Sequence, residues 1–116
     1  MDDIREYVSS GKVHYITIAP EIDRAPEAIS YLSKNNIKVA IGHSAATSED
    51  VKQAISNGAV SVTHFYNAMR KDLDDTSYLT GFSLNQSLLF LELIIDGVHV
   101  PFEILKEIIK LSLIHI

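Results

Sequence analysis

The sequence contains no cysteine. This absence excludes disulfide bonds and thiolate metal ligands, so a metal site in this chain would have to use His, Asp or Glu side chains. A chain without cysteine also fits a reducing compartment, and we expect a cytoplasmic location.

Long apolar runs are absent too. The longest extends from Leu88 to Ile95, contains Glu92, and is far shorter than the roughly 20 residues that cross a bilayer. The opening segment MDDIREYVSS is charged and lacks the apolar core of a signal peptide. We therefore expect no association with a membrane.

The sequence also lacks blocks of basic residues. The sequence has 10 Lys and Arg against 15 Asp and Glu, a formal net charge of −5, and the two signs are interspersed. Without a basic stripe to follow a phosphate backbone, nucleic acid is not an expected partner. The 116 residues, 47% of them hydrophobic and 22% charged, are typical of one small globular domain.

Apolar, β-branched runs alternate with amphipathic segments along the chain. Strands are expected within VHYITIAPE, IKVAIGHSA, AVSVTHFYNAM and SLLFLELIIDGVHV. This alternation predicts an α/β fold with a parallel sheet, and runs that are apolar nearly throughout predict a sheet covered on both faces. No linker divides the chain, which indicates a single domain over residues 1–116.

Start signals mark the helices between these strands. Asp23 is expected to cap a helix that has Pro26 at its first position, and Thr47 or Ser48 is expected to cap the next helix. Pro101 is expected to open the last one. Its expected inward-facing residues are Phe102, Leu105, Ile108 and Ile109.

Two histidines follow consecutive expected strands, His43 in VAIGHSAAT and His64 in VTHFYNAM. Functional side chains of parallel α/β sheets lie where strands end. Neighbouring strands are about 4.8 Å apart, and two imidazole nitrogens on one zinc ion lie within roughly 3.5 Å of each other. The pair could therefore bind zinc or another divalent metal, with a position left for water. Alternatively, each histidine is a hydrogen-bonded structural residue, and spacing does not decide between these interpretations.

Other polar residues near strand ends are further candidates. His99 in DGVHV could polarise a substrate carbonyl or bond to the backbone, and Glu21 could be a metal carboxylate. His14 precedes a strand and is interpreted as structural. Gly42 and Gly97 either allow a close backbone approach or occupy turns.

Four segments, TIAPE, GHSAAT, VTHFYNAM and IIDGVHV, carry a resemblance over residues 16–100. In order and spacing they resemble the N-acetylglucosamine-6-phosphate deacetylases, a family of the amidohydrolase superfamily with a metal-containing (β/α)8 barrel. Because a whole barrel takes about 250 residues, the resemblance implies a partial TIM-type barrel of about four βα units, an internal fragment of a catalytic barrel.

The resemblance also implies roles for individual residues. His43 and His64 match the two histidines that bind the catalytic metal, most naturally zinc, with iron or another divalent ion as alternatives. Asn67 and Ala68 match the pair that holds the sugar phosphate, and His99 matches the histidine that contacts the substrate and polarises the acetamide carbonyl. The implied activity is hydrolysis of N-acetylglucosamine 6-phosphate to acetate and glucosamine 6-phosphate in amino-sugar catabolism. The implied partners are an amino-sugar phosphate and, for the parent enzyme, a second identical subunit.

The chain departs from the family pattern in several places. The family's glutamate ligand stands in an earlier Glu-Gly-Pro segment, and its His-x-His strand is also earlier; neither is matched here. The catalytic aspartate lies beyond the helix that follows DGVHV, and LSLIHI does not resemble the approach to it. Residues 70–82, expected to form a long surface loop, lack the Arg-x-Pro-Gly pattern that contributes a phosphate-binding arginine, which Arg70 or Lys71 could replace.

These departures predict that the chain alone is inactive. A half barrel exposes two edge strands and much of its inner face, so we also expect marginal stability and self-association. Two alternatives stay open. One is another amidohydrolase that acts on a different N-acyl or cyclic amide, and the other is a non-catalytic barrel remnant that acts as an interaction protein.

Overall fold

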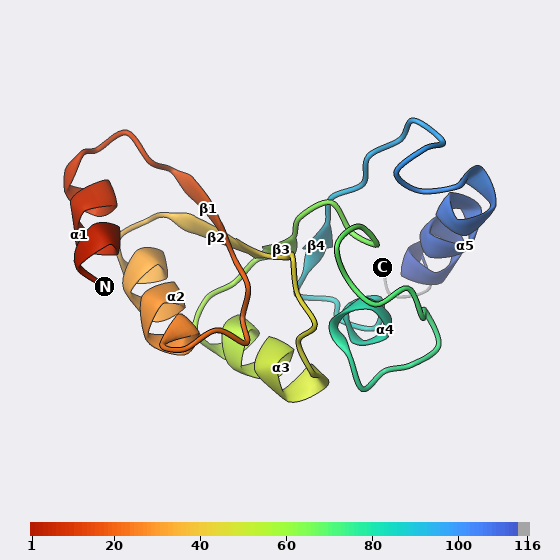
Figure 1. The fold of residues 1–116 in the computed structure, drawn as a ribbon, viewed down its shortest axis with the longest axis horizontal. Helices are drawn as coiled ribbons and strands as arrows, with labels where there is room; N and C mark the ends of the chain where they lie inside the picture. The colour runs from red at the N-terminus through yellow and green to blue at the C-terminus, as the bar shows by residue number, and fades with distance from the viewer. Residues whose placement is uncertain (114–116) are drawn as a thin grey trace.

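A computed structural model describes residues 1–113, with only the backbone described at 112 and 113; residues 114–116, which include His115, lie outside the described residues. The strands form one parallel sheet of four, in the order β1-β2-β3-β4 (Figure 1). Their bounds are Tyr15–Ile18 for β1, Lys38–Ile41 for β2, Ser61–Val62 for β3 and Phe90–Leu91 for β4. The α/β fold with a parallel sheet is confirmed.

Helices connect these strands as a parallel sheet requires. Their bounds are Asp2–Ser9 for α1, Ala25–Lys34 for α2, Ser48–Ser56 for α3, Leu79–Ser83 for α4 and Phe102–Leu113 for α5. Among the residues that the structure describes, no helix is both long and apolar enough to cross a membrane.

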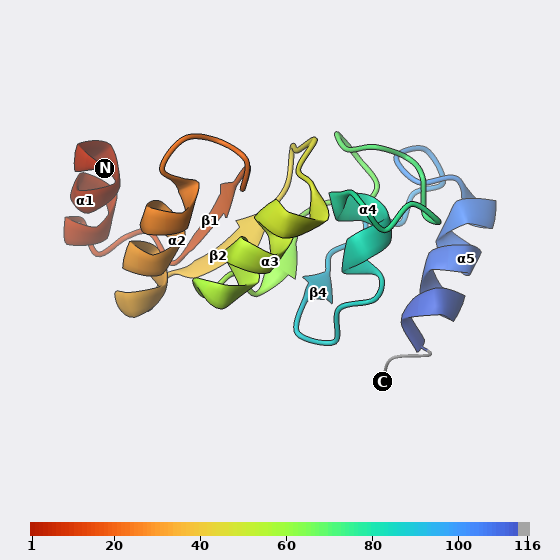
Figure 2. The same ribbon diagram turned by 90° about the horizontal axis from the view of Figure 1, so that it is seen from below.

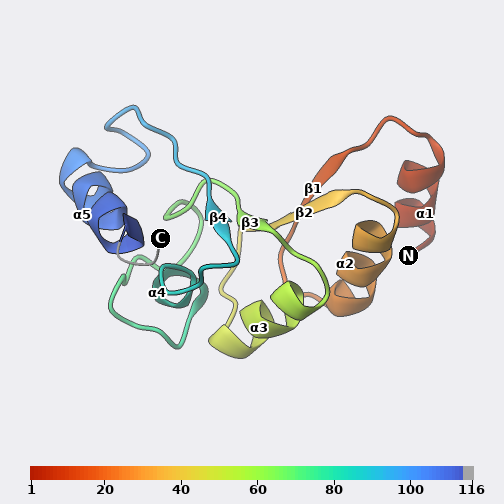
Figure 3. The same cartoon turned by 180° about the vertical axis from the view of Figure 1, so that it is seen from behind.

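The helices cover only one side of the sheet. Figures 1 and 2 show α2 and α3 against that side, and Figure 3 shows α1 and α5 at opposite ends of the molecule. No helix within residues 1–113 covers the other side, so Tyr15 on β1 is 46% exposed and Phe90 on β4 is 77% exposed. The arrangement is that of an arc of a barrel with its helices outside.

The core lies between the sheet and these helices. Val39 and Ile41 of β2 pack there with Ile29 and Leu32 of α2 and with Phe65, and all five side chains are 0% exposed. Ile29 and Leu32 are three residues apart and therefore share one face of the helix. This face of α2 packs against the sheet.

The predicted start of α3 is confirmed, but that of α2 is wrong. Thr47 is the N-cap of α3: its hydroxyl accepts from the Asp50 N–H, and the Asp50 carboxylate accepts from the Thr47 N–H, which completes a capping box. For α2, the N-cap is Arg24 rather than Asp23. The Ala28 N–H bonds the Arg24 carbonyl, so the cap lies one residue later than predicted, and the helix already begins at Ala25, before Pro26.

The third and fourth strands are much shorter than the sequence indicates. Only Ser61–Val62 and Phe90–Leu91 pair, and after β3 the chain soon leaves the extended conformation. Beyond β3, His64 has φ 31° and Tyr66 has φ 81°. The expectation that His99 ends the fourth strand is therefore wrong, and this histidine lies on the loop between β4 and α5.

Two other local predictions need correction. Residues 70–82 do not form one continuous loop, because α4 begins at Leu79. In α5, Leu105 and Ile108 are buried as predicted, whereas Phe102 is 58% exposed and Ile109 is 42% exposed. The Phe102 ring lies over Gly97, where a Cβ atom would be 2.5 Å from it, so this side chain contacts the preceding loop rather than the core.

Candidate functional site

His43 and His64 meet at the carboxyl end of the sheet. Each follows its strand by two residues, and the register pairs Ile41, the end of β2, with Val62, the end of β3. The two Nε2 atoms are 2.8 Å apart, and the ring centroids are 4.4 Å apart with the planes at 88°. The strand ends thus bring two imidazole nitrogens to one point.

The backbone at both histidines is unusual. His43 has φ 51° and His64 has φ 31°, a region that residues other than glycine seldom adopt. Such conformations persist only where surrounding contacts hold them, and they are concentrated at functional sites. Here the contacts include the Thr63 N–H bond to the Ile41 carbonyl at 2.9 Å and the Phe65 N–H bond to the Glu92 carbonyl at 2.7 Å.

Gly42 allows the two strand ends to approach each other. A Cβ atom at this position would lie 2.4 Å from the Thr63 Cγ2 atom, a distance that real Cβ atoms essentially never show. The predicted role of Gly42 in a close approach is confirmed. Gly97, with φ +75°, occupies a turn, and the Phe102 ring lies close over it.

The donor atoms of the two histidines suit a borderline divalent metal. Tetrahedral zinc ligands at about 2.0–2.1 Å from the ion hold two nitrogens about 3.3 Å apart, so the observed pair would need to separate by only about 0.5 Å. The buried Nδ1 of His64 has no hydrogen-bond partner among the described residues. The described part of the chain contains no group of three or more His, Cys, Asp or Glu residues that could hold a metal. The pair therefore fits two ligand positions of such a site.

Glu21, the other candidate metal ligand, does not join this group. Its Oε2 accepts from the Ser44 hydroxyl at 2.6 Å, and its Oε1 accepts from the Ala45 N–H at 3.2 Å. The carboxylate thus bonds the loop that follows His43.

Asn67 and Ala68 belong to the turn that follows β3. The Asn67 N–H bonds the His64 carbonyl at 2.9 Å, and the Ala68 carbonyl accepts from the Ser44 N–H at 3.0 Å. The Asn67 Nδ2 atom is buried without a partner within the described residues. Ala68 contributes to an open cavity of about 500 Å³, whose lining residues are His43, Ser44, Ala45, Ala68, Met69 and Arg70.

The two cations considered for phosphate binding lie over aromatic rings. The Arg70 guanidinium carbon is 3.8 Å from the ring centroid of Tyr78, and the Lys71 Nζ is 4.4 Å from that of Tyr66. Of the two cations, only Arg70 lines the cavity beside His43.

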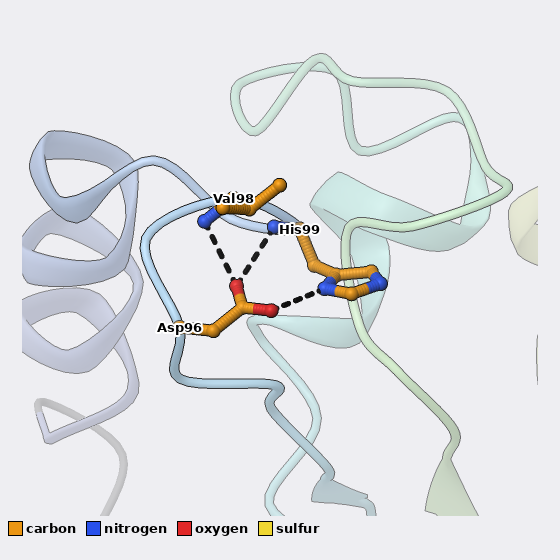
Figure 4. A network of polar contacts seen from close by, with 3 residues as sticks. All are labelled: Asp96, Val98 and His99. Atoms are coloured by element: carbon orange, nitrogen blue, oxygen red, sulfur yellow. Dashed lines mark hydrogen bonds and ion pairs between the residues drawn. The ribbon is translucent and has the colours of Figure 1, made fainter.

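His99 lies apart from this cavity and is bound to Asp96 (Figure 4). Its Nδ1 is 2.6 Å from the Asp96 Oδ2, while the Asp96 Oδ1 accepts from the backbone N–H groups of His99 at 2.9 Å and Val98 at 2.8 Å. These bonds stabilise the carboxylate, the backbone bond from His99 most of all, and lower the pKa of Asp96 to about 2. An ionised carboxylate cannot donate a hydrogen bond, so the His99 Nδ1 carries the proton of this bond. The His99 Nε2 takes no part in it.

The Asp96 carboxyl group is expected to titrate near pH 2. Because its folded pKa lies below the ordinary 3.8, its stabilising contribution is present above about pH 4 and is lost as the pH falls toward 2. Carboxyl carbon NMR shifts, recorded from pH 1.5 to 6 and assigned with Asp96→Asn, measure this midpoint. A midpoint at or above 3.8 would contradict the turn geometry.

Sequence reasoning missed two supporting residues, Asp96 and Ser44. Asp96 could have been found, because Asp followed by Gly and then His three residues away is typical of an Asx turn. The role of Ser44 had no local signal, since its partner Glu21 comes from the preceding βα loop.

Comparisons with known proteins support one relationship. No family model matches the chain. It is 37% identical over 93 residues to an N-acetylgalactosamine-6-phosphate deacetylase of Escherichia coli O157:H7, covering 80% of this chain and 25% of that protein. It is 34% identical over 103 residues to the N-acetylglucosamine-6-phosphate deacetylase of Rattus norvegicus, covering 84% of this chain and 25% of that protein.

Comparison with solved structures supports the same relationship. N-acetyl-D-glucosamine-6-phosphate deacetylase from Mycobacterium smegmatis, a mutant in complex with N-acetyl-D-glucosamine-6-phosphate, matches with a TM-score of 0.86 and 35% identity over 96% of this chain and 30% of that one. The enzyme from Thermotoga maritima matches with a TM-score of 0.77 and 35% identity over 86% of this chain and 27% of that one. This chain is therefore homologous to part of the N-acetylglucosamine-6-phosphate deacetylases and spans about a quarter of the length of the curated relatives.

Proposed function

We propose that residues 1–116 form one partial-barrel domain that supplies metal-binding and substrate-binding residues to a deacetylase of N-acetylglucosamine 6-phosphate. The observation that carries this proposal is the 2.8 Å approach of the His43 and His64 Nε2 atoms at the ends of adjacent parallel strands. The homologous enzyme from Mycobacterium smegmatis, whose complex contains N-acetyl-D-glucosamine-6-phosphate, supports the substrate class.

In this proposal His43 and His64 hold a divalent metal, most naturally zinc. When bound, such an ion supplies Lewis-acid activation of water for amide hydrolysis. The protein's own contribution is to hold both imidazoles with their Nε2 atoms converging. The tight pairing of β2 with β3, which Gly42 permits, provides this arrangement.

Asn67 and Ala68 are proposed to hold the sugar phosphate. The buried amide nitrogen of Asn67 has no partner within residues 1–113 and can donate, and Ala68 lines the cavity beside His43. Arg70 lines the same cavity and could add a positive charge. These neighbouring groups suit an anion of the size of a phosphate ester.

His99 is proposed to polarise the acetamide carbonyl. With its Nδ1 proton donated to the Asp96 carboxylate, its Nε2 can donate to a carbonyl oxygen only in the imidazolium form. In that form the cation would stabilise the developing oxyanion.

The resemblance assigns two further roles, a carboxylate ligand and a catalytic aspartate, to segments that residues 1–116 do not match. We therefore propose that this chain alone does not release acetate. The activity should appear when those segments are present in the same molecule.

A segment exchange tests the proposed function. Residues 2–113 replace the homologous segment of the Mycobacterium smegmatis deacetylase, and acetate released from N-acetylglucosamine 6-phosphate is measured. We expect metal-dependent turnover that falls at least about 100-fold in His43→Ala or His64→Ala, because even residues that only support a ligand are worth roughly 10–100-fold. His14→Ala, an exposed histidine before β1, is the control and should leave turnover unchanged. A folded, zinc-loaded exchange protein that releases no acetate would contradict the proposal.

A second candidate substrate is N-acetylgalactosamine 6-phosphate. The match to the Escherichia coli deacetylase of that sugar, at 37% identity, favours it specifically. The same exchange protein distinguishes the two candidates through the ratio of kcat/KM for the two sugar phosphates.

A further inference from the structure

We propose that Glu21 is a positioning residue, which holds the His43 loop in its metal-binding conformation through Ser44. The inference deepens the proposed function and depends on the metal site described there. Glu21 does not touch the metal or the substrate in this proposal. It acts from the loop after β1 on the loop after β2.

The Glu21 carboxylate makes two hydrogen bonds to the residues directly after His43. The Ser44 hydroxyl donates to Oε2 at 2.6 Å, and the Ala45 N–H donates to Oε1 at 3.2 Å. Hydrogen bonds to an ionised acceptor are shorter and about twice as strong as neutral ones. Both carboxylate oxygens are therefore used to fix one short segment of backbone.

Ser44 passes this restraint to the rest of the site. Its side chain is buried, at 4% exposed, and its Oγ also accepts from the Ala46 N–H at 2.8 Å. Its own N–H donates to the Ala68 carbonyl at 3.0 Å. One carboxylate thus connects the loops that follow β1, β2 and β3.

The loop needs such a restraint because His43 is held at φ 51°. A residue with a β-carbon leaves this region of positive φ when contacts with its surroundings no longer hold its backbone there. Release of the loop would let His43 turn away from His64. The main effect of losing Glu21 should therefore fall on metal affinity.

A role in general stability would look different. Glu21 is exposed and contributes no apolar surface to the core. Its removal should leave the folded, metal-free protein largely unchanged. The metal-free melting temperature is thus the readout that separates positioning from ordinary structural support.

The test is zinc affinity, measured by calorimetric titration of the purified, metal-free chain. We expect Glu21→Ala to weaken zinc binding about 10–100-fold, the usual effect of removing a residue that orients a ligand, with little change in the metal-free melting temperature. Glu21→Gln keeps an acceptor for the Ala45 N–H and gains an amide N–H that can donate to the Ser44 hydroxyl oxygen, so it should recover most of the affinity. Ser44→Ala should match Glu21→Ala, and the double variant should be no worse than either single one.

Glu27→Ala is the matched control. It removes the same charge from a carboxylate that pairs with Arg24 on the surface, so zinc affinity should not change. If Glu21→Ala binds zinc like the wild type, or no more weakly than Glu27→Ala, the positioning role is wrong. It is also wrong if affinity and metal-free melting temperature fall together in both Glu21→Ala and Glu21→Gln. If the wild type binds zinc no better than His43→Ala, the proposed function itself has failed.

Discussion

Phe65→Ala is expected to lower the free energy of unfolding by about 3–5 kcal/mol, the usual cost of emptying a buried phenylalanine site. The Phe65 side chain is 0% exposed and is among the largest fully buried side chains of the described residues. Its backbone N–H is fixed to the Glu92 carbonyl at 2.7 Å, which limits how far the chain can collapse into the vacated space. A small domain is stable by only about 5–15 kcal/mol, so this loss removes a large share of the total free energy of unfolding.

Urea denaturation followed by circular dichroism measures this change. Phe90→Ala is the matched control, because the same atoms are removed from a side chain that is 77% exposed. Its effect should stay within about 0.5 kcal/mol. A loss below about 1 kcal/mol in Phe65→Ala would mean that the core between sheet and helices is not packed as described.

Gly42→Ala is expected to destabilise the protein by about 1–3 kcal/mol and to weaken zinc binding by His43 and His64. The new Cβ atom would lie 2.4 Å from the Thr63 Cγ2 atom, and threonine is stiff at χ1. Relief of the clash must separate the ends of β2 and β3. His43 is the next residue, so its Nε2 would move away from that of His64.

Thr63→Ser provides the control, because it deletes the Cγ2 atom and keeps the hydroxyl. The other contacts of the new Cβ are at 3.5 Å or more, so Gly42→Ala in a Thr63→Ser background should regain both stability and zinc affinity. A double-mutant cycle measures this coupling. Additive effects of the two substitutions would show that the clash is not the cause.

Features with a local physical cause could be predicted from the sequence. The alternation of strands and helices follows from hydrophobic periodicity, and the capping box of α3 follows from Thr47 and Asp50 at the required spacing. The pairing of His43 with His64 followed from a general rule, that neighbouring parallel strands end at the same edge of a sheet.

Features that depend on tertiary contacts could not be predicted from the sequence. The lengths of β3 and β4 depend on where the backbone leaves the ladder, as at His64, and apolar composition does not report this. The exposure of Phe102 depends on its contact with Gly97. The partner of Glu21 lies 23 residues away, on another loop. Each requires knowledge of which segments meet.

The most direct test of a metal site at His43 and His64 is the zinc K-edge X-ray absorption spectrum of the zinc-loaded chain. We expect two imidazole nitrogens at about 2.0–2.1 Å from the zinc ion, reduced to one in His64→Ala or in His43→Ala. Bound zinc without imidazole scattering, or a spectrum that neither substitution changes, would contradict a metal site at this pair.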